Sequence, residues 1–171
     1  MMLLKHEKFI AIALFAFSFL FFPHFQSLAQ QPSSPIPPAD FKIIAIAGGV
    51  APWDTESKVE IDAQGHGIYY TMSADDRANG EFKKVNEFTV EQVSLKRIYG
   101  TVAQADFFNL KEKYADQGTL GGSFAEITVS LHGKTHMVRT QNIKLQAFDD
   151  INIAINLATP QDNKIQYNAI L

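Results

Sequence analysis

The chain has 171 residues, a formal net charge of −3 at pH 7 and no cysteine. The absence of cysteine excludes disulfides, thiolate zinc sites and a cysteine nucleophile, so the fold has to rely on its hydrophobic core. The 15 basic and 18 acidic residues are spread along the chain without a basic run, which disfavours nucleic acids and anionic membranes as partners.

Residues 1–29 are typical of a cleavable signal peptide. Basic residues precede an apolar run over residues 9–22, which is shorter than the ~20 residues of a membrane-spanning helix. Ser27 and Ala29 are small residues at the two positions that a signal peptidase reads. We expect cleavage after Ala29, a periplasmic or extracellular location and no stable membrane anchor after cleavage. The alternative is an uncleaved N-terminal anchor.

The remainder of the chain is predicted to contain one folded domain. Residues 30–40 hold four prolines, which is typical of an extended linker. Residues 41–171 suffice for a single domain that buries roughly two thirds of the surface its unfolded chain exposes.

The first half of this domain has the pattern of β-strands. Residues 41–47 are rich in β-branched side chains and end at two glycines, as a strand does before a loop. Alternating polar and apolar residues over 58–62 and 68–70 predict a hairpin with a glycine-bearing turn. The apolar residues between 82 and 88 are too few to decide whether a fourth strand follows.

A helix is predicted to start at Thr89. Gln92 lies three residues further on and completes a capping box, while Phe88 and Val93 occupy the positions of a hydrophobic staple. Apolar residues then repeat at helical spacing, and we expect the helix to end near Asp106.

A second hairpin is predicted over residues 126–140. Apolar and polar residues alternate on both sides of His132-Gly133, which suits a two-residue turn because glycine accepts a positive φ angle and histidine tolerates one.

The last predicted element is a helix with an apolar stripe of Phe148, Ile151 and Ile155, which stops before Pro160. The predicted order is therefore strands, helix, strands, helix. Such an order indicates an α+β fold in which an antiparallel sheet carries both helices on one face.

No group of residues has the spacing of a catalytic or metal site. The candidates are three histidines and two acidic pairs: His66, His132, His136, Asp75-Asp76 and Asp149-Asp150. No carboxylate lies close in sequence to His132 and His136 to complete a ligand set, and adjacent aspartates are better explained as solvated surface or as a complement to a helix dipole. The chain also lacks a Gly-x-Ser-x-Gly motif. We therefore expect neither an enzyme nor a metal or other cofactor.

The loop with Pro52, Trp53 and Asp54 is the predicted binding surface. It holds the only tryptophan of the chain, and exposed aromatic residues on loops dominate protein contacts. The alternative is that Trp53 folds back over one end of the sheet. Phe107 and Phe108 are instead expected to fill the gap between helix and sheet.

Residues 88–157 carry a resemblance to known proteins. A capped helix is followed by Ala-Asp-Phe-Phe-Asn-Leu at 105–110 and by a hairpin with a Gly-x-x-His step at 133–136. This succession resembles short exported bacterial domains of unknown function, and it is similar to the emfourin family, inhibitors of thermolysin-type metalloproteases. The resemblance implies a compact α+β domain and raises protease inhibition as an activity, and it assigns no inhibitory residue.

Three functions follow from these patterns. The first is a non-enzymatic exported binding or accessory domain whose partner is another exported protein. The second is a protein inhibitor of a secreted metalloprotease, which needs a rigid exposed loop. The third is an enzyme whose residues meet only in three dimensions. None of these patterns sets the oligomeric state.

Overall fold

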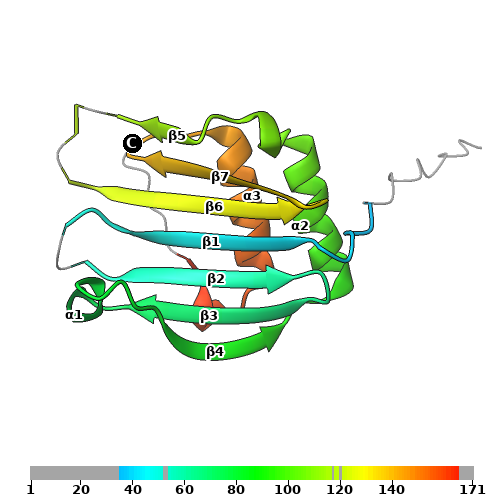
Figure 1. Ribbon diagram of the computed structural model, residues 1–171, viewed down its shortest axis with the longest axis horizontal. Coiled ribbons are helices and arrows are strands. Elements are labelled where there is room, and N and C mark those ends of the chain that lie inside the picture. Colours follow the sequence, from blue (N-terminus) through cyan, green and yellow to red (C-terminus); the bar gives the residue numbers. More distant parts are fainter. Residues whose placement is uncertain (1–34, 52–53, 117, 120, 166–171) are drawn as a thin grey trace, which may run out of the picture. The chain divides into compact units, whose positions relative to one another are not determined.

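A seven-stranded sheet carries the fold in the part of the chain that the computed structural model describes, residues 35–51, 54–116, 118–119 and 121–165 (Figure 1). The strands are β1 (Lys42–Gly49), β2 (Glu56–Asp62), β3 (His66–Met72), β4 (Lys83–Thr89), β5 (Lys113–Ala115), β6 (Ser123–Leu131) and β7 (Lys134–Gln141). The helices are α1 (Ala74–Arg77), α2 (Gln92–Gln104) and α3 (Gln146–Ala158), with short 3-10 turns η1 (Phe107–Asn109) and η2 (Gln161–Asn163).

The strand order is β4-β3-β2-β1-β6-β7-β5, and most neighbours are antiparallel. The α+β class and the mostly antiparallel sheet are thus confirmed. The sheet is not antiparallel throughout as the sequence had suggested, because β5 pairs with β7 in parallel. A three-residue edge strand such as β5 is too short to show the alternation by which a strand is recognised in a sequence.

One face of the sheet holds the core. Helices α2 and α3 lie side by side across this face (Figure 1). Alternate residues of the central strands point toward them, and the apolar stripes of the helices meet these residues. The most deeply buried apolar side chains, each 0–1% exposed, are Phe41, Ile43, Val59, Ile61, Leu95, Ile98, Phe107, Ile127, Val129, Val138, Phe148, Ile151 and Ile155.

Helix α2 starts later than predicted. Its first residue is Gln92 and its N-cap is Glu91, which makes no side-chain capping bond, so the expected Thr89 capping box is wrong. Thr89 ends β4 instead, and the backbone N–H of Val90 donates to the carbonyl oxygen of Gly65 at 2.7 Å. Val93 is 61% exposed and therefore forms no hydrophobic staple. Because β4 pairs with β3 as far as Thr89, the helix begins later than the local sequence pattern predicts.

Both predicted hairpins are confirmed, and so is the expected packing of Phe107 and Phe108. His132 and Gly133 have φ angles of 52° and 70°, as the tight turn between β6 and β7 requires. Phe107 is 1% exposed and packs in the core, with Phe108 partly buried beside it.

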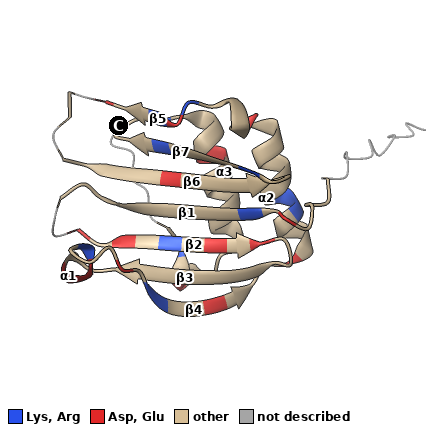
Figure 2. Ribbon diagram, viewed as in Figure 1, with Lys and Arg blue, Asp and Glu red and all other residues tan. Residues whose placement is uncertain are grey.

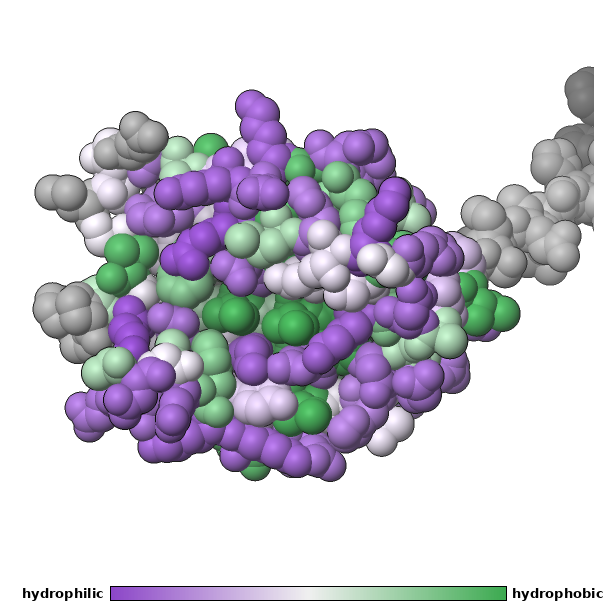
Figure 3. Space-filling view, viewed as in Figure 1, coloured by the Kyte–Doolittle hydropathy of each residue, from purple (hydrophilic) through white to green (hydrophobic). Residues whose placement is uncertain are grey.

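The opposite face of the sheet has balanced charges. Figure 2 shows acidic and basic residues side by side on β2. Lys42 and Lys58 lie 2.7 Å and 2.9 Å from the Glu60 carboxylate, and Lys58 Nζ also lies 4.0 Å from the centre of the Tyr70 ring. Apolar side chains gather between these charges in the middle of the face (Figure 3).

Candidate binding site at one end of the sheet

Two glycines end β1 and allow a close approach of the following loop. A Cβ atom on Gly48 would lie 2.6 Å from Cγ of Glu56, and one on Gly49 would overlap the Asp54 carboxylate. Neither glycine has room for a side chain. Because these two glycines have no side chain, Asp54 can fold back against the end of the strand.

Asp54 closes the segment between residues 51 and 54. Its carboxylate oxygen Oδ2 accepts from the Ala51 backbone N–H at 2.9 Å, and its own N–H donates to the Ala51 carbonyl at 3.0 Å. Of the predicted binding residues, only Asp54 is described, because Pro52 and Trp53 lie outside the described residues.

Arg77 holds the same segment from the other side. One guanidinium nitrogen donates to the Ala51 carbonyl at 3.3 Å, and the other donates to the Asp54 carbonyl at 2.9 Å and contacts Glu56 at 3.1 Å. These bonds reach across more than 20 residues of sequence, so they tie Ala51 and Asp54 to helix α1. Both ends of the predicted binding loop are therefore pinned.

The short helix α1 positions Arg77. Its N-cap is Ser73, which forms a capping box with Asp76. A hydrogen bond from Lys83, followed by one from Ser73, lowers the pKa of Asp76 and so favours its charged form. The polar stretch of the sequence had given no reason to predict that this arginine contacts the loop.

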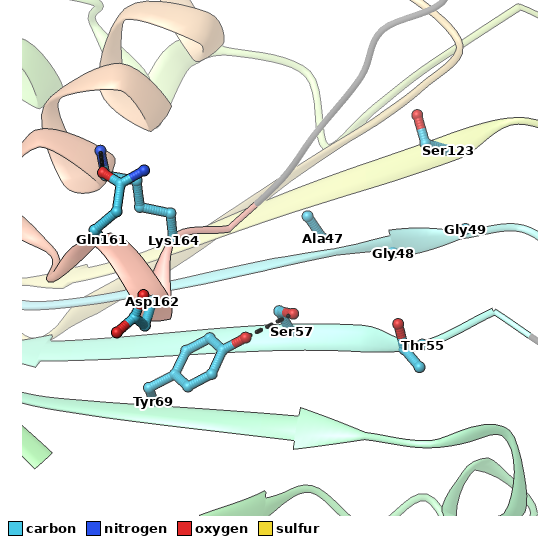
Figure 4. A pocket seen from close by; sticks show the side chains of 10 residues that line it. All are labelled: Ala47, Gly48, Gly49, Thr55, Ser57, Tyr69, Ser123, Gln161, Asp162 and Lys164. Atoms are coloured by element: carbon cyan, nitrogen blue, oxygen red, sulfur yellow. Dashed lines mark hydrogen bonds between the residues drawn. The ribbon is translucent and has the colours of Figure 1, made fainter. Parts of the chain in front are cut away.

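An open cleft of about 620 Å³ lies next to this loop (Figure 4). Its floor is the helix-bearing face of the sheet, beyond the end of α3, and η2 forms one wall. The lining residues are Ala47, Gly48, Gly49, Thr55, Ser57, Tyr69, Ser123, Gln161, Asp162 and Lys164. The sequence had indicated no such cleft, because its walls come from strands and a turn that are far apart along the chain.

Four of the described lining residues carry hydroxyl groups. Ser57 Oγ and Tyr69 Oη are 3.1 Å apart and hydrogen-bonded, and Tyr69 is 9% exposed. Lys164 Nζ donates to the Gln161 side-chain oxygen at 2.6 Å on the wall above them. The Ser57 hydroxyl is thus bonded to another hydroxyl.

The candidate histidines lie apart from one another and from the cleft. His66 on β3 lies 3.4 Å from Glu87, whereas His136 Nε2 contacts the Leu110 carbonyl oxygen at 2.9 Å and its ring packs against Phe107. His132 occupies the turn between β6 and β7. Within the described ranges, no three histidine or acidic side chains are grouped as metal ligands.

The acidic pairs are part of helix starts. Asp75 and Asp76 lie in the first turn of α1. Asp149 lies in the first turn of α3, where burial raises its pKa, the nearby Lys144 lowers it, and the neighbouring Asp150 raises it again; the net change is upward. None of these carboxylates lines the cleft.

Among the described residues, no helix is both long and apolar enough to cross a membrane. Comparison with known protein families and with curated proteins found no match. The resemblance to the emfourin family therefore stays a prediction.

Proposed function

We propose that the protein is an exported, non-enzymatic binding domain. Its binding surface is the glycine end of β1, where the segment 51–54 and the adjacent cleft lie next to each other. The proposal keeps the layout expected from the sequence, strands, helix, strands and helix with both helices on one face, because this layout leaves one end of the sheet for binding. Export follows from the leader at residues 1–29.

One observation carries this proposal. Asp54 and Arg77 fix both ends of the segment that contains Pro52 and Trp53. A loop that is fixed before binding loses less conformational entropy when it meets a partner, which raises affinity. The Arg77–Glu56 ion pair and the partly buried hydrogen bonds of Arg77 and Asp54 hold the two ends of this segment, which is easiest to explain if the segment has a partner.

The test is capture of another exported protein from an extract of exported proteins of the source organism. Trp53→Ala removes the predicted anchor, and Arg77→Ala releases the loop; each should weaken binding of the captured protein at least about tenfold. Arg97→Ala is the matched control, because Arg97 is exposed on α2 away from the loop. Equal affinity in all three variants would show that the surface lies elsewhere.

The pinned segment also favours a second function, inhibition of a secreted metalloprotease. A protein inhibitor has to hold an exposed loop rigidly in a protease cleft, and the bonds from Asp54 and Arg77 fix the two ends of the segment 51–54. Titration of purified thermolysin with the protein tests this function. Inhibition at a one-to-one ratio that disappears in Trp53→Ala would support it, and full protease activity at a tenfold excess would exclude this protease as the target.

A further inference from the structure

The cleft lies where the helix-bearing face of the sheet changes from apolar to polar side chains. Beneath the helices, β2 and β6 place Ile61 and Ile127 on this face, and these side chains are 0% and 1% exposed. Beyond the helices, the same face carries Ser57 on β2 and Ser123 on β6 (Figure 4). This end of the face therefore presents polar side chains, although Ala47 and Tyr69 in the same lining also pack in the core.

The Ser57–Tyr69 pair is suited to bind hydroxyl groups. Two hydroxyls offer two donors and several acceptor lone pairs, and their mutual bond uses one donor. The pair thus keeps a donor and acceptors for a ligand. Packing fixes Tyr69, which is 9% exposed, so the pair is held in place before a ligand arrives.

The charged side chains on the wall have opposite signs. Asp162 and Lys164 are the charged residues among the described lining of the cleft, and they come from one short stretch of chain. Their formal charges cancel, which gives no advantage to a strongly anionic or cationic ligand. The cleft therefore favours an uncharged ligand that is rich in hydrogen-bonding groups.

We propose that this cleft binds a neutral saccharide. The inference rests on the proposed function, because it names a ligand class for the same surface. Its volume of about 620 Å³ falls in the range of ~300–1,000 Å³ that is usual for small-ligand sites. A saccharide presents many hydroxyls without charge, which matches the lining.

A peptide fits the cleft less well. Peptides commonly bind a sheet by adding a strand to its edge, whereas the floor of this cleft is the face of β1, β2, β3 and β6. Both sides of β1 are already paired, with β2 and with β6, so its backbone groups are engaged. A peptide would also find few apolar side chains in this lining to hold its own.

The test uses protein purified from a host that expresses the full 171-residue chain. The ¹⁵N-labelled protein is titrated with maltotriose, cellotriose and chitotriose, and with trigalacturonate as an anionic counterpart. We expect at least one neutral trisaccharide to shift the amide signals of Gly48, Gly49 and Ser57, and trigalacturonate to bind at least about tenfold more weakly. No shift with any neutral trisaccharide, or equal binding of trigalacturonate, would overturn the inference.

Conservative variants locate the site. Ser57→Ala and Tyr69→Phe each remove one hydroxyl and should weaken saccharide binding about two- to tenfold, the usual range for one neutral hydrogen bond. Ser130→Ala is the matched control, because Ser130 forms a similar hydroxyl pair with Thr135, 2.9 Å away and outside the cleft. Equal affinity in all three variants would place the saccharide elsewhere and overturn the assignment.

The outcomes for this inference and for the proposed function can be told apart. If no saccharide binds while Trp53→Ala and Arg77→Ala still lose the exported partner, the saccharide inference fails and the proposed function stands. If a saccharide binds through Ser57 and Tyr69 while the loop variants change nothing, the loop part of the proposed function fails and the saccharide inference stands.

Discussion

At the scale of single residues, the contact between Gly49 and Asp54 determines how the loop is held. Gly49→Ala would drive a methyl group into the Asp54 carboxylate, and we expect it to lower the free energy of unfolding by about 1–3 kcal/mol. Urea denaturation measures this change. Gly118→Ala is the control, since among the described residues its Cβ would meet Asp116 alone, at an ordinary 3.4 Å. In an Asp54→Gly background, which removes the whole overlapping side chain, Gly49→Ala should cost clearly less; an unchanged cost would contradict the overlap.

The ion pairs of Glu60 predict a pH-dependent contribution to stability. Burial raises the pKa of Glu60, but hydrogen bonds and charges from Lys42 and Lys58 outweigh burial, so the pKa is lowered from 4.5 in the folded protein. A carboxyl with a lowered pKa contributes stability that is present above its unfolded pKa and is lost as the pH falls through the folded one. Glu60→Gln should therefore destabilise by about 1 kcal/mol at pH 7, and by less below pH ~4.

Urea denaturation of wild type and Glu60→Gln between pH 7 and pH 3 measures this difference. Glu112→Gln serves as the control, because Glu112 is exposed and has no ion pair among the described residues. A difference between wild type and Glu60→Gln that stays constant on acidification would show that the lysines do not stabilise the charged form of Glu60.

At the scale of elements, the turn η1 offers a comparison between neighbouring residues. Phe107 is 1% exposed in the core, whereas Phe108 is only partly buried. Phe107→Ala should cost about 3–5 kcal/mol because it leaves a cavity, and Phe108→Ala should cost clearly less. Thermal and urea unfolding of both variants check the order. Equal losses would mean that the two rings share the plugging role.

The same elements show what the sequence could predict. Apolar periodicity is strong in α3, where Phe148, Ile151 and Ile155 are buried as expected. The start of α2 was misplaced because Thr89 and Gln92 have the spacing of a capping box, while the pairing of β4 with β3 draws Thr89 into a strand. A local helix-start pattern is overridden where hydrogen bonding to a distant strand engages the same backbone groups.

At the scale of the whole molecule, the cleft is the feature that no local sequence pattern predicts. Serine, threonine and tyrosine occur on many strand surfaces, and only the strand order brings Ser57 and Ser123 to one hollow. The loop with Asp54 was visible as a candidate, but its anchor Arg77 was not, because the two residues are 23 positions apart. The mutual approach of distant segments therefore limits how much of a site can be derived from a single sequence.

Export is the prediction that concerns the chain as a whole. Two features of residues 1–29, basic residues before a short apolar run and small residues at 27 and 29, should lead a signal peptidase to cleave after Ala29. Expression of the full chain in a bacterial host, followed by fractionation and intact-mass spectrometry, should find a product that begins at Gln30 outside the cytoplasm. An intact chain in the membrane fraction would instead identify an uncleaved anchor. Ala29→Leu is the matched variant, because a bulky residue at the cleavage site should retain the leader without removing the apolar run, so that export and cleavage are read separately.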